Sequence, residues 1–133
     1  MSKRTHDYFA SLDIPIISIF GMTESSGAST SWSRNKAKSY TCGHTLQGTK
    51  IKIDNPDKDG VGEICMKGRH CFLGYYKNEK ATREMYDSEG YIHSGDLGIM
   101  NDGFLEIKGR IKELIITAGG ENVAPILIED LFK

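Results

Sequence analysis

Three polar clusters flanked by glycines contain residue types that could do chemistry. The first is FGMTESSG at residues 20–27, directly after a β-branched apolar run. The Thr23 hydroxyl can bond a phosphate oxygen, and Glu24 offers the hard carboxylate oxygens that Mg²⁺ prefers. From the residue types alone, the favoured interpretation is a loop whose hydroxyls bond their own backbone. A nucleotide–metal site is the alternative.

The second cluster is YIHSGDLG at residues 91–98. An acidic residue held by a tight glycine turn, here Asp96, can accept hydrogen bonds from ribose hydroxyls. The simpler alternative is that Asp96 only caps the turn. Taken alone, this cluster is a weak indication of nucleotide binding.

The third cluster is GRIKELIITAGGENVAP at residues 109–125. The planar guanidinium of Arg110 suits phosphate or ribose oxygens, and Lys112 adds a mobile positive charge. A solvated strand that carries a surface arginine and lysine is the alternative interpretation.

The cysteines do not form a recognisable metal site. Cys42, Cys65 and Cys71 lack the C-x2-C spacing of a zinc site, although Cys42 lies near His44 and Cys71 follows His70. Buried, reduced thiols in an intracellular protein are the favoured interpretation. The sequence also has no Walker loop, G-x-G-x-x-G fingerprint, G-x-S-x-G elbow or H-E-x-x-H pair.

The composition limits the function classes further. The chain has 133 residues, with 17 Lys and Arg against 18 Asp and Glu and a formal net charge of −1. This balance disfavours a nucleic-acid-binding arm or a polybasic membrane anchor. No apolar run approaches the roughly 20 residues that span a bilayer, and no secretory signal pattern begins the sequence.

The elements that must position these clusters follow from the hydrophobic pattern. The 15 glycines are spread along the chain beside only 3 prolines, which predicts many short elements joined by tight turns. The fold class is therefore expected to be a β-rich α+β fold with antiparallel hairpins and short helices. We expect a helix over residues 2–12, capped by Ser2, with three inward apolar side chains, Tyr8, Phe9 and Leu12.

The rest of the chain is predicted to alternate strands, turns and helices. Strands or apolar runs are expected at residues 14–20, 50–54, 62–67, 97–100, 104–107 and 113–117. A loop is expected over 22–38, turns at 57–60 and 101–103, and helices at 78–86 and 125–133. The helix at 78–86 would be capped by Asn78.

In their order and spacing, the clusters resemble the motifs of the adenylate-forming superfamily of acyl-CoA synthetases, luciferases and peptide-synthetase adenylation domains. The family motif Y-G-x-T-E matches residues 20–24, and [YW]-x-x-[ST]-G-D matches residues 91–96. The motif G-E-[IL]-x-x-x-G matches residues 62–68, and the G-Y that follows it matches 74–75. The motif G-R-x-[KD] matches residues 109–112, and V-x-P-x-x-[IL]-E matches 123–129. The phrases MTESSG, HSGDLG and IITAGGENV are most similar to long-chain fatty acid–CoA ligases of the bubblegum type.

The resemblance implies a role for each matching residue. Three would be catalytic, with Thr23 contacting phosphates, Glu24 binding Mg²⁺ and Lys112 acting as the hinge. The implied cofactor-binding residues are Phe20, Gly21, Thr23, Asp96, Arg110, Gly119 and Gly120. Phe20 would lie beside the adenine without the hydroxyl of the family's tyrosine.

The remaining implied contacts concern the ribose and CoA. Asp96 would hold the ribose hydroxyls, and Arg110 the ribose or a phosphate. Gly119 and Gly120 would approach the pantetheine arm of CoA.

The resemblance also implies a domain division and a reaction. Residues 1–109 would end a large AMP-binding domain, 110–112 would be the hinge, and 113–133 would begin a small C-terminal domain. The implied enzyme is an acid–thiol ligase that uses ATP and Mg²⁺ to convert a fatty acid to acyl-AMP, and then transfers the acyl group to CoA. The family's phosphate loop and most of its acyl pocket are expected upstream, and its catalytic lysine downstream, so we expect these residues to be inactive alone.

The expected partners are fatty acid, ATP and CoA, with no nucleic acid. The expected location is cytoplasmic, with peripheral contact at the endoplasmic reticulum or other membranes through other regions. Two alternatives remain. The chain is either a short non-catalytic nucleotide-binding or interaction protein that kept the fold, or a family member that acts on another carboxylate.

Overall fold

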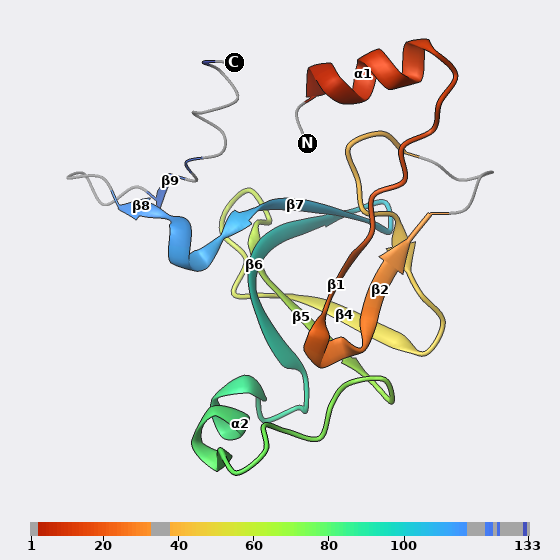
Figure 1. Ribbon diagram of the computed structural model, residues 1–133. Helices are drawn as coiled ribbons and strands as arrows, with labels where there is room; N and C mark the ends of the chain where they lie inside the picture. Colours follow the sequence, from red (N-terminus) through yellow and green to blue (C-terminus); the bar gives the residue numbers. More distant parts are fainter. Residues whose placement is uncertain (1–2, 33–37, 117–121, 124, 126–131, 133) are drawn as a thin grey trace.

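The computed structural model describes residues 3–32, 38–116, 122–123, 125 and 132. Its main feature is a seven-stranded antiparallel sheet in the order β1-β2-β3-β7-β6-β5-β4 (Figure 1). The strands are β1 (Phe20–Met22), β2 (Gly27–Ser31), β3 (His44–Thr45), β4 (Thr49–Asp54), β5 (Gly62–Gly68), β6 (Ile92–Asn101) and β7 (Phe104–Arg110). A separate two-stranded sheet pairs β8 (Ile115–Ile116) with β9 (Asn122–Val123).

Short helices accompany the sheet. The α-helices are α1 (Lys3–Ser11) and α2 (Glu79–Met85), and two 3₁₀ turns are η1 (Thr23–Ser25) and η2 (Ile111–Glu113). In Figure 1 the two α-helices lie at opposite ends of the molecule as drawn, with the main sheet between them. This arrangement confirms the predicted sheet-rich α+β fold.

The core lies on the central strands. Ile64 and Met66 of β5, Ile92 of β6 and Leu105 of β7 are fully buried. In β5 these apolar residues alternate with period 2, so that Ile64 and Met66 share one face of the sheet. The strands that carry the candidate site residues are therefore anchored by the best-packed part of the protein.

Most of the predicted hairpins and the middle helix are confirmed. β4 pairs with β5 across the turn at residues 57–60, and β6 pairs with β7 across the turn at 101–103. The cap of α2 is the predicted one, since the Asn78 side chain accepts a hydrogen bond from the Ala81 N–H at 3.1 Å.

The prediction of a buried strand over residues 14–20 is wrong. Only Phe20 belongs to a strand, and Ile14, Ile17 and Ile19 are 48%, 53% and 58% exposed. A strand needs a hydrogen-bonding neighbour, and no strand in the described part of the chain lies alongside residues 14–19. A β-branched run therefore stays extended and exposed.

The prediction of a loop over residues 22–38 is also wrong, because it contains β2. The Ser and Thr composition suggested a loop, but Ser29 and Thr30 are fully buried in the strand. The Thr30 hydroxyl donates to the Cys42 carbonyl at 2.7 Å, which satisfies a buried polar group. Polar side chains fit a strand when neighbouring backbone accepts their hydrogen bonds.

The orientation predicted for α1 is wrong, although the helix itself is confirmed. Tyr8 and Leu12 are 61% and 52% exposed, whereas His6 is 7% exposed. The His6 ring packs against Tyr40, with ring centroids 4.9 Å apart. In this helix of nine residues, the covered face is therefore the one that carries His6 and meets Tyr40.

Three smaller expectations have mixed outcomes. Cys42 and Cys65 are buried free thiols and Cys71 is partly buried and free, as predicted. The apolar run at 113–117 forms a strand only at β8, with Glu113 in η2. The final helix lies largely outside the described residues. Among those residues, no helix combines the length and apolar character that crossing a membrane requires.

Candidate functional site

The first cluster forms the tight connection between β1 and β2. The Ser25 hydroxyl accepts a hydrogen bond from the Met22 N–H at 3.1 Å and donates one to the Gly27 carbonyl at 2.9 Å. Ser26 adopts the left-handed conformation with φ 55°. The backbone-bonding interpretation of this cluster therefore applies to Ser25, while Thr23 is exposed at the tip.

Gly21 is required by a close approach of the two strands. A Cβ atom at this position would lie 1.9 Å from the Gly27 carbonyl oxygen. Because that neighbour is backbone, no side-chain movement could relieve the clash. The glycine in the motif therefore allows β1 and β2 to meet at the turn.

Glu24 is held from two directions. Its backbone carbonyl accepts the Phe72 N–H at 2.8 Å, and its carboxylate oxygen Oε1 accepts the Tyr75 hydroxyl at 2.6 Å. The hydrogen bond to Glu24, together with partial burial, raises the pKa of Tyr75. The phenol therefore remains a donor, and it orients the Glu24 carboxylate.

Asp96 lies in a pronounced bulge of β6. Glu63 pairs with Leu97 and Cys65 pairs with His93, so one residue of β5 faces three residues of β6, at 94–96. A bulge bends its strand and re-aims a side chain, often beside a functional site. Here it aims Asp96 away from the regular ladder.

Two hydrogen bonds fix the shape of this bulge. Glu63 Oε1 accepts the Gly95 N–H at 2.9 Å, and the Ser94 hydroxyl accepts the Asp96 N–H at 3.0 Å. Gly95 has φ 73°, a conformation that favours glycine. The sequence motif S-G-D is thus a specific backbone shape held by an acidic residue of the adjacent strand.

Arg110 lies opposite Asp96 in the β6–β7 register. Its Nε donates to Asp96 Oδ1 at 2.9 Å, with the Arg110 side chain 64% exposed and that of Asp96 18% exposed. Because the guanidinium is largely exposed, this ion pair contributes little to stability. Arg110 is therefore accessible to a ligand, while the Asp96 carboxylate is partly buried beside it.

These residues surround one hollow of about 290 Å³. Its lining includes Phe20 and Gly21 of β1, Asp96 of β6, and Gly109 and Arg110 of β7. Residues of all three sequence clusters therefore meet at this hollow.

A second hollow, of about 570 Å³, adjoins the first. The two share Ile19 and Gly21 in their linings, and Thr23 and Ser26 lie on the second. The Asp96–Arg110 pair and the Thr23 hydroxyl therefore belong to two hollows that meet at residues 19 and 21.

The remaining predicted site residues are placed differently. Phe20 borders the first hollow, but its side chain is 5% exposed and belongs to the hydrophobic core. Glu24 lines neither hollow and faces Tyr75, and Lys112 is exposed in η2. Gly119 and Gly120 are outside the described residues.

Sequence reasoning assigned no role to Glu63, Tyr75 or Ser25, which position the predicted site residues. Glu63 stands between apolar residues in a central strand, and Tyr75 follows Gly74 in a tight loop. A polar residue inside a core strand was the one local signal for Glu63. Tyr75 meets Glu24 across 51 residues, so no local pattern reveals that contact.

Comparison with known proteins identifies relatives of this chain. Residues 1–76 match the family described as AMP-binding enzyme. Long-chain-fatty-acid–CoA ligase ACSBG2 of Gallus gallus is 50% identical over 134 aligned residues, which cover 100% of this chain and 18% of that protein. ACSBG2 of Homo sapiens is 48% identical, and ACSBG1 of Rattus norvegicus is 46% identical, each over 100% of this chain. The chain spans about a fifth of the length of these curated relatives.

Solved structures show the same fold. O-succinylbenzoate coenzyme A synthetase (MenE) of Bacillus subtilis, in complex with ATP and magnesium ion, superimposes with a TM-score of 0.83 at 27% identity, covering 99% of this chain and 29% of that one. ATP-bound MatB of Rhodopseudomonas palustris gives a TM-score of 0.85 at 30% identity, covering 95% of this chain and 26% of that one.

The family match covers residues 1–76, more than half of the chain, and relatives 46–50% identical align over all of it. From these findings together, the chain belongs to the family of AMP-binding enzymes.

Proposed function

We propose that this chain is a segment of a long-chain fatty acid–CoA ligase. The single observation that carries the proposal is the meeting of Phe20, Asp96 and Arg110 at one hollow. The chain is also 46–50% identical along its whole length to ligases of the bubblegum group. The hollow supports adenylate chemistry, and the names of the relatives support the fatty-acid class.

The nucleotide contacts follow from charge and geometry. Asp96 presents a carboxylate on a rigid bulge, which suits two ribose hydroxyls as donors. Arg110 presents a fork of N–H donors beside it, which suits phosphate or ribose oxygens. Thr23, on the adjoining hollow, would bond a phosphate oxygen, and the adenine would lie near Phe20 and Gly21.

Glu24 fits a role as a Mg²⁺ ligand. One of its carboxylate oxygens accepts the Tyr75 hydroxyl, and the other has no partner among the described residues. Mg²⁺ in nucleotide sites takes one or two carboxylates together with substrate phosphates and water. When bound, the ion would offset negative charge on the phosphates.

The proposed reaction has two steps that balance. A fatty carboxylate oxygen forms a bond to the α-phosphorus of ATP while the bond to pyrophosphate breaks. The CoA sulfur then bonds to the acyl carbon, AMP leaves with the C–O electron pair, and the thiol proton passes to a base or water. This chain would supply three contacts to the nucleotide. Asp96 would bind the ribose, Arg110 would supply a positive charge, and Thr23 would contact a phosphate.

The domain division is part of the proposal. Residues 1–109 would end the large domain, residues 110–112 would form the hinge, and residues 113–133 would begin the small domain. Lys112 would be the pivot, and Gly119 and Gly120 would approach the pantetheine arm of CoA. We expect a cytoplasmic location with peripheral contact at membranes, where fatty acids partition.

A chimeric ligase tests the proposed function. The chain would replace the 134 aligned residues of the human ACSBG2 protein, and palmitate-dependent ATP–pyrophosphate exchange would be measured. The proposal requires exchange within about tenfold of the human protein, and CoA-dependent palmitoyl-CoA formation. A folded chimera with a native far-UV spectrum and no exchange would overturn it.

The native gene product decides between a ligase segment and a short non-catalytic protein. An antibody raised to residues 41–57 would recognise the exposed loop at 55–59 and capture the protein from source tissue. A band several times heavier than 14.8 kDa, with palmitate-dependent exchange in the captured fraction, is expected. A band only at that mass, without exchange, would favour the non-catalytic alternative.

A further inference from the structure

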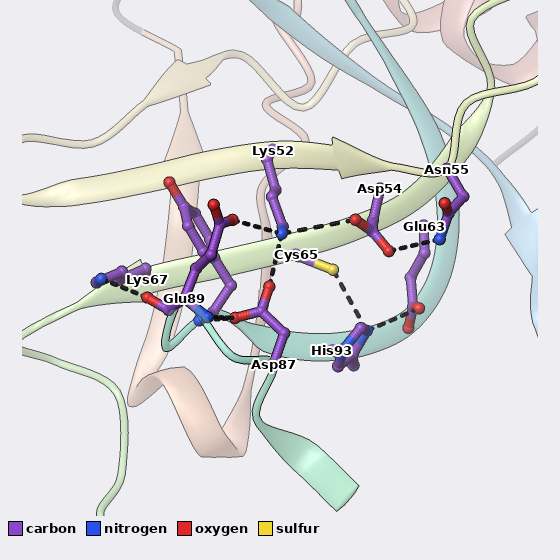
Figure 2. A network of polar contacts seen from close by, with 10 residues as sticks. Lys52, Asp54, Asn55, Glu63, Cys65, Lys67, Asp87, Glu89 and His93 are labelled. Atoms are coloured by element: carbon purple, nitrogen blue, oxygen red, sulfur yellow. Dashed lines mark hydrogen bonds and ion pairs between the residues drawn. The ribbon is translucent and has the colours of Figure 1, made fainter.

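Three potential metal ligands face one another between β5 and β6. His93 Nδ1 lies 2.9 Å from Glu63 Oε2 and 3.4 Å from Cys65 Sγ. The three ligand atoms all lie within 4.8 Å of one another. Figure 2 shows the three side chains converging from two adjacent strands.

The donor set and its spacing suit a thiophilic divalent cation. Thiolate, imidazole and carboxylate are the ligands of tetrahedral Zn²⁺, with bonds of about 2.0–2.3 Å, so neighbouring ligand atoms are about 3.3–3.6 Å apart. The separations of His93 from its two neighbours are close to that range. A small rotation of the Glu63 side chain would bring its carboxylate within that distance of Cys65 Sγ.

The ligands are already oriented by the fold. Cys65 and His93 are direct partners in the β5–β6 register, at the rigid centre of the sheet. Glu63 Oε1 accepts the Gly95 N–H at 2.9 Å, which leaves Oε2 facing His93. Outer hydrogen bonds of this kind orient metal ligands in proteins.

The surrounding charge favours a cation. Lys52 lies 3.5 Å from Asp54, 2.6 Å from Asp87 and 2.9 Å from Glu89. These three carboxylates and Glu63 outnumber the two lysines drawn in the network, Lys52 and Lys67, and Lys67 bonds the Glu89 carbonyl (Figure 2).

Solvent can reach the site. The side chains of Glu63 and His93 are 20% and 30% exposed. Glu63 also lines a hollow of about 520 Å³ together with Asp54 and Asp57. A cation can therefore approach along acidic side chains, and a fourth coordination position can hold water.

We propose that Glu63, Cys65 and His93 form a binding site for a Zn²⁺-like divalent cation, separate from the nucleotide contacts. Binding would form a metal–sulfur bond and release the Cys65 proton to solvent. The His93 proton would move to Nε2, so that Nδ1 offers its lone pair. The metal would then tie β5 to β6 directly behind the Asp96 bulge.

Cobalt titration of the reduced, chelator-treated 133-residue chain tests this site. We expect a thiolate-to-cobalt absorption band that saturates at one Co²⁺ per chain and disappears when Zn²⁺ is added. We also expect protons to be released on binding at neutral pH, because the thiolate rather than the thiol binds the metal. Neither readout depends on nucleotide binding, so the outcome is independent of the proposed ligase function.

Matched variants identify the ligands. Cys65→Ser should lose the band, while the double variant Cys42→Ser and Cys71→Ser should keep it. Glu63→Gln, which removes the charge but keeps the shape, should weaken binding at least about tenfold. Far-UV circular dichroism would confirm that each variant is folded. No band, or a band that survives in folded Cys65→Ser, would overturn the proposal.

Discussion

At the scale of single residues, the candidate site depends on one exposed charge and one partly buried charge that are well oriented. Asp96 and Arg110 pair at 2.9 Å at the rim of a hollow. Because the Arg110 side chain is largely exposed, the pair contributes little to folding, so substitutions there should affect ligand binding more than stability. The residue types of both could be read from the sequence. Glu63, which shapes the Asp96 bulge, and Tyr75, which orients Glu24, could not, because each acts through a contact distant in the sequence.

Replacing Asp96 with Asn should weaken ATP selectively. Hydrogen bonds to a charged group contribute about 1.5–3 kcal/mol, so the KM for ATP in the chimeric ligase should rise about 10- to 100-fold. The KM for palmitate should change little. Asp102→Asn is a matched control in the exposed turn after β6, where the side chain is 88% exposed. Equal effects of the two substitutions would argue against a ribose contact.

Removing the Tyr75 hydroxyl should weaken the response to Mg²⁺. Tyr75→Phe deletes the 2.6 Å hydrogen bond to Glu24 and leaves that carboxylate less oriented. We expect a roughly threefold to tenfold higher Mg²⁺ concentration for half-maximal activity, since one hydrogen bond contributes about 1 kcal/mol. Tyr76→Phe, at an 88% exposed position, should have no effect. An unchanged Mg²⁺ titration for Tyr75→Phe would show that Glu24 needs no such support.

At the scale of elements, hairpins and turns explain both the successes and the failures of sequence reasoning. The 101–103 turn and the strands beside it were predicted because Asn-Asp-Gly is a local signal. The strand β2 was missed because its buried hydroxyls are satisfied by backbone from another segment. The run at 14–19 was mistaken for a strand because apolar character does not supply a pairing partner.

Gly21→Ala should open the β1–β2 hairpin. The added methyl carbon would lie 1.9 Å from a backbone oxygen, so the strands must separate. We expect loss of exchange activity in the chimera and faster amide hydrogen exchange at residues 20–31. Ala28→Gly, at an exposed position of the same hairpin, should retain at least half of the activity. Unchanged exchange rates in Gly21→Ala would contradict the close approach.

Asp87 should make the connection between α2 and β6 sensitive to acid. Burial opposes its ionisation, but hydrogen bonds from Lys52 and from the N–H groups of Tyr91 and Glu89 prevail and lower the pKa of Asp87 to about 2. A lowered pKa gives stability that is present above the unfolded value of about 4 and is lost as the pH falls towards 2.

Urea unfolding of the chain and its Asp87→Asn variant would check this. The variant should be less stable at neutral pH, and the difference should shrink as the pH falls from about 4 to about 2. Asp59→Asn, in the exposed turn after β4, should show no such trend. A difference that stays constant with pH would contradict the role of Asp87.

At the scale of the whole molecule, a run of exposed apolar side chains leads from α1 to the site and borders it. Tyr8, Leu12, Ile14, Ile17 and Ile19 are each about half exposed or more, and they follow one another from α1 to the start of β1. Single exposed apolar residues are ordinary, but a contiguous stretch of this kind favours association.

The isolated chain should therefore self-associate. Sedimentation velocity should show species larger than 14.8 kDa that increase with protein concentration. The double substitution Ile14→Lys and Ile17→Lys should shift the distribution towards the monomer, whereas Lys58→Ala in an exposed turn should not. A monodisperse monomer with a sharp, cooperative melt would contradict this expectation.

The bulge in β6 suggests a deletion that would change the site without changing the fold. Three residues of β6 lie opposite one residue of β5, so β6 has two more residues than its partner at this point. Because two is even, excising Ser94 and Gly95 would leave every later side chain of β6 on its original face. Asp96 would then lie opposite Ile64 in a regular β5–β6 ladder, and the buried and exposed faces of the sheet would be kept. A two-codon deletion should thus give a folded protein that lacks the proposed ribose contact.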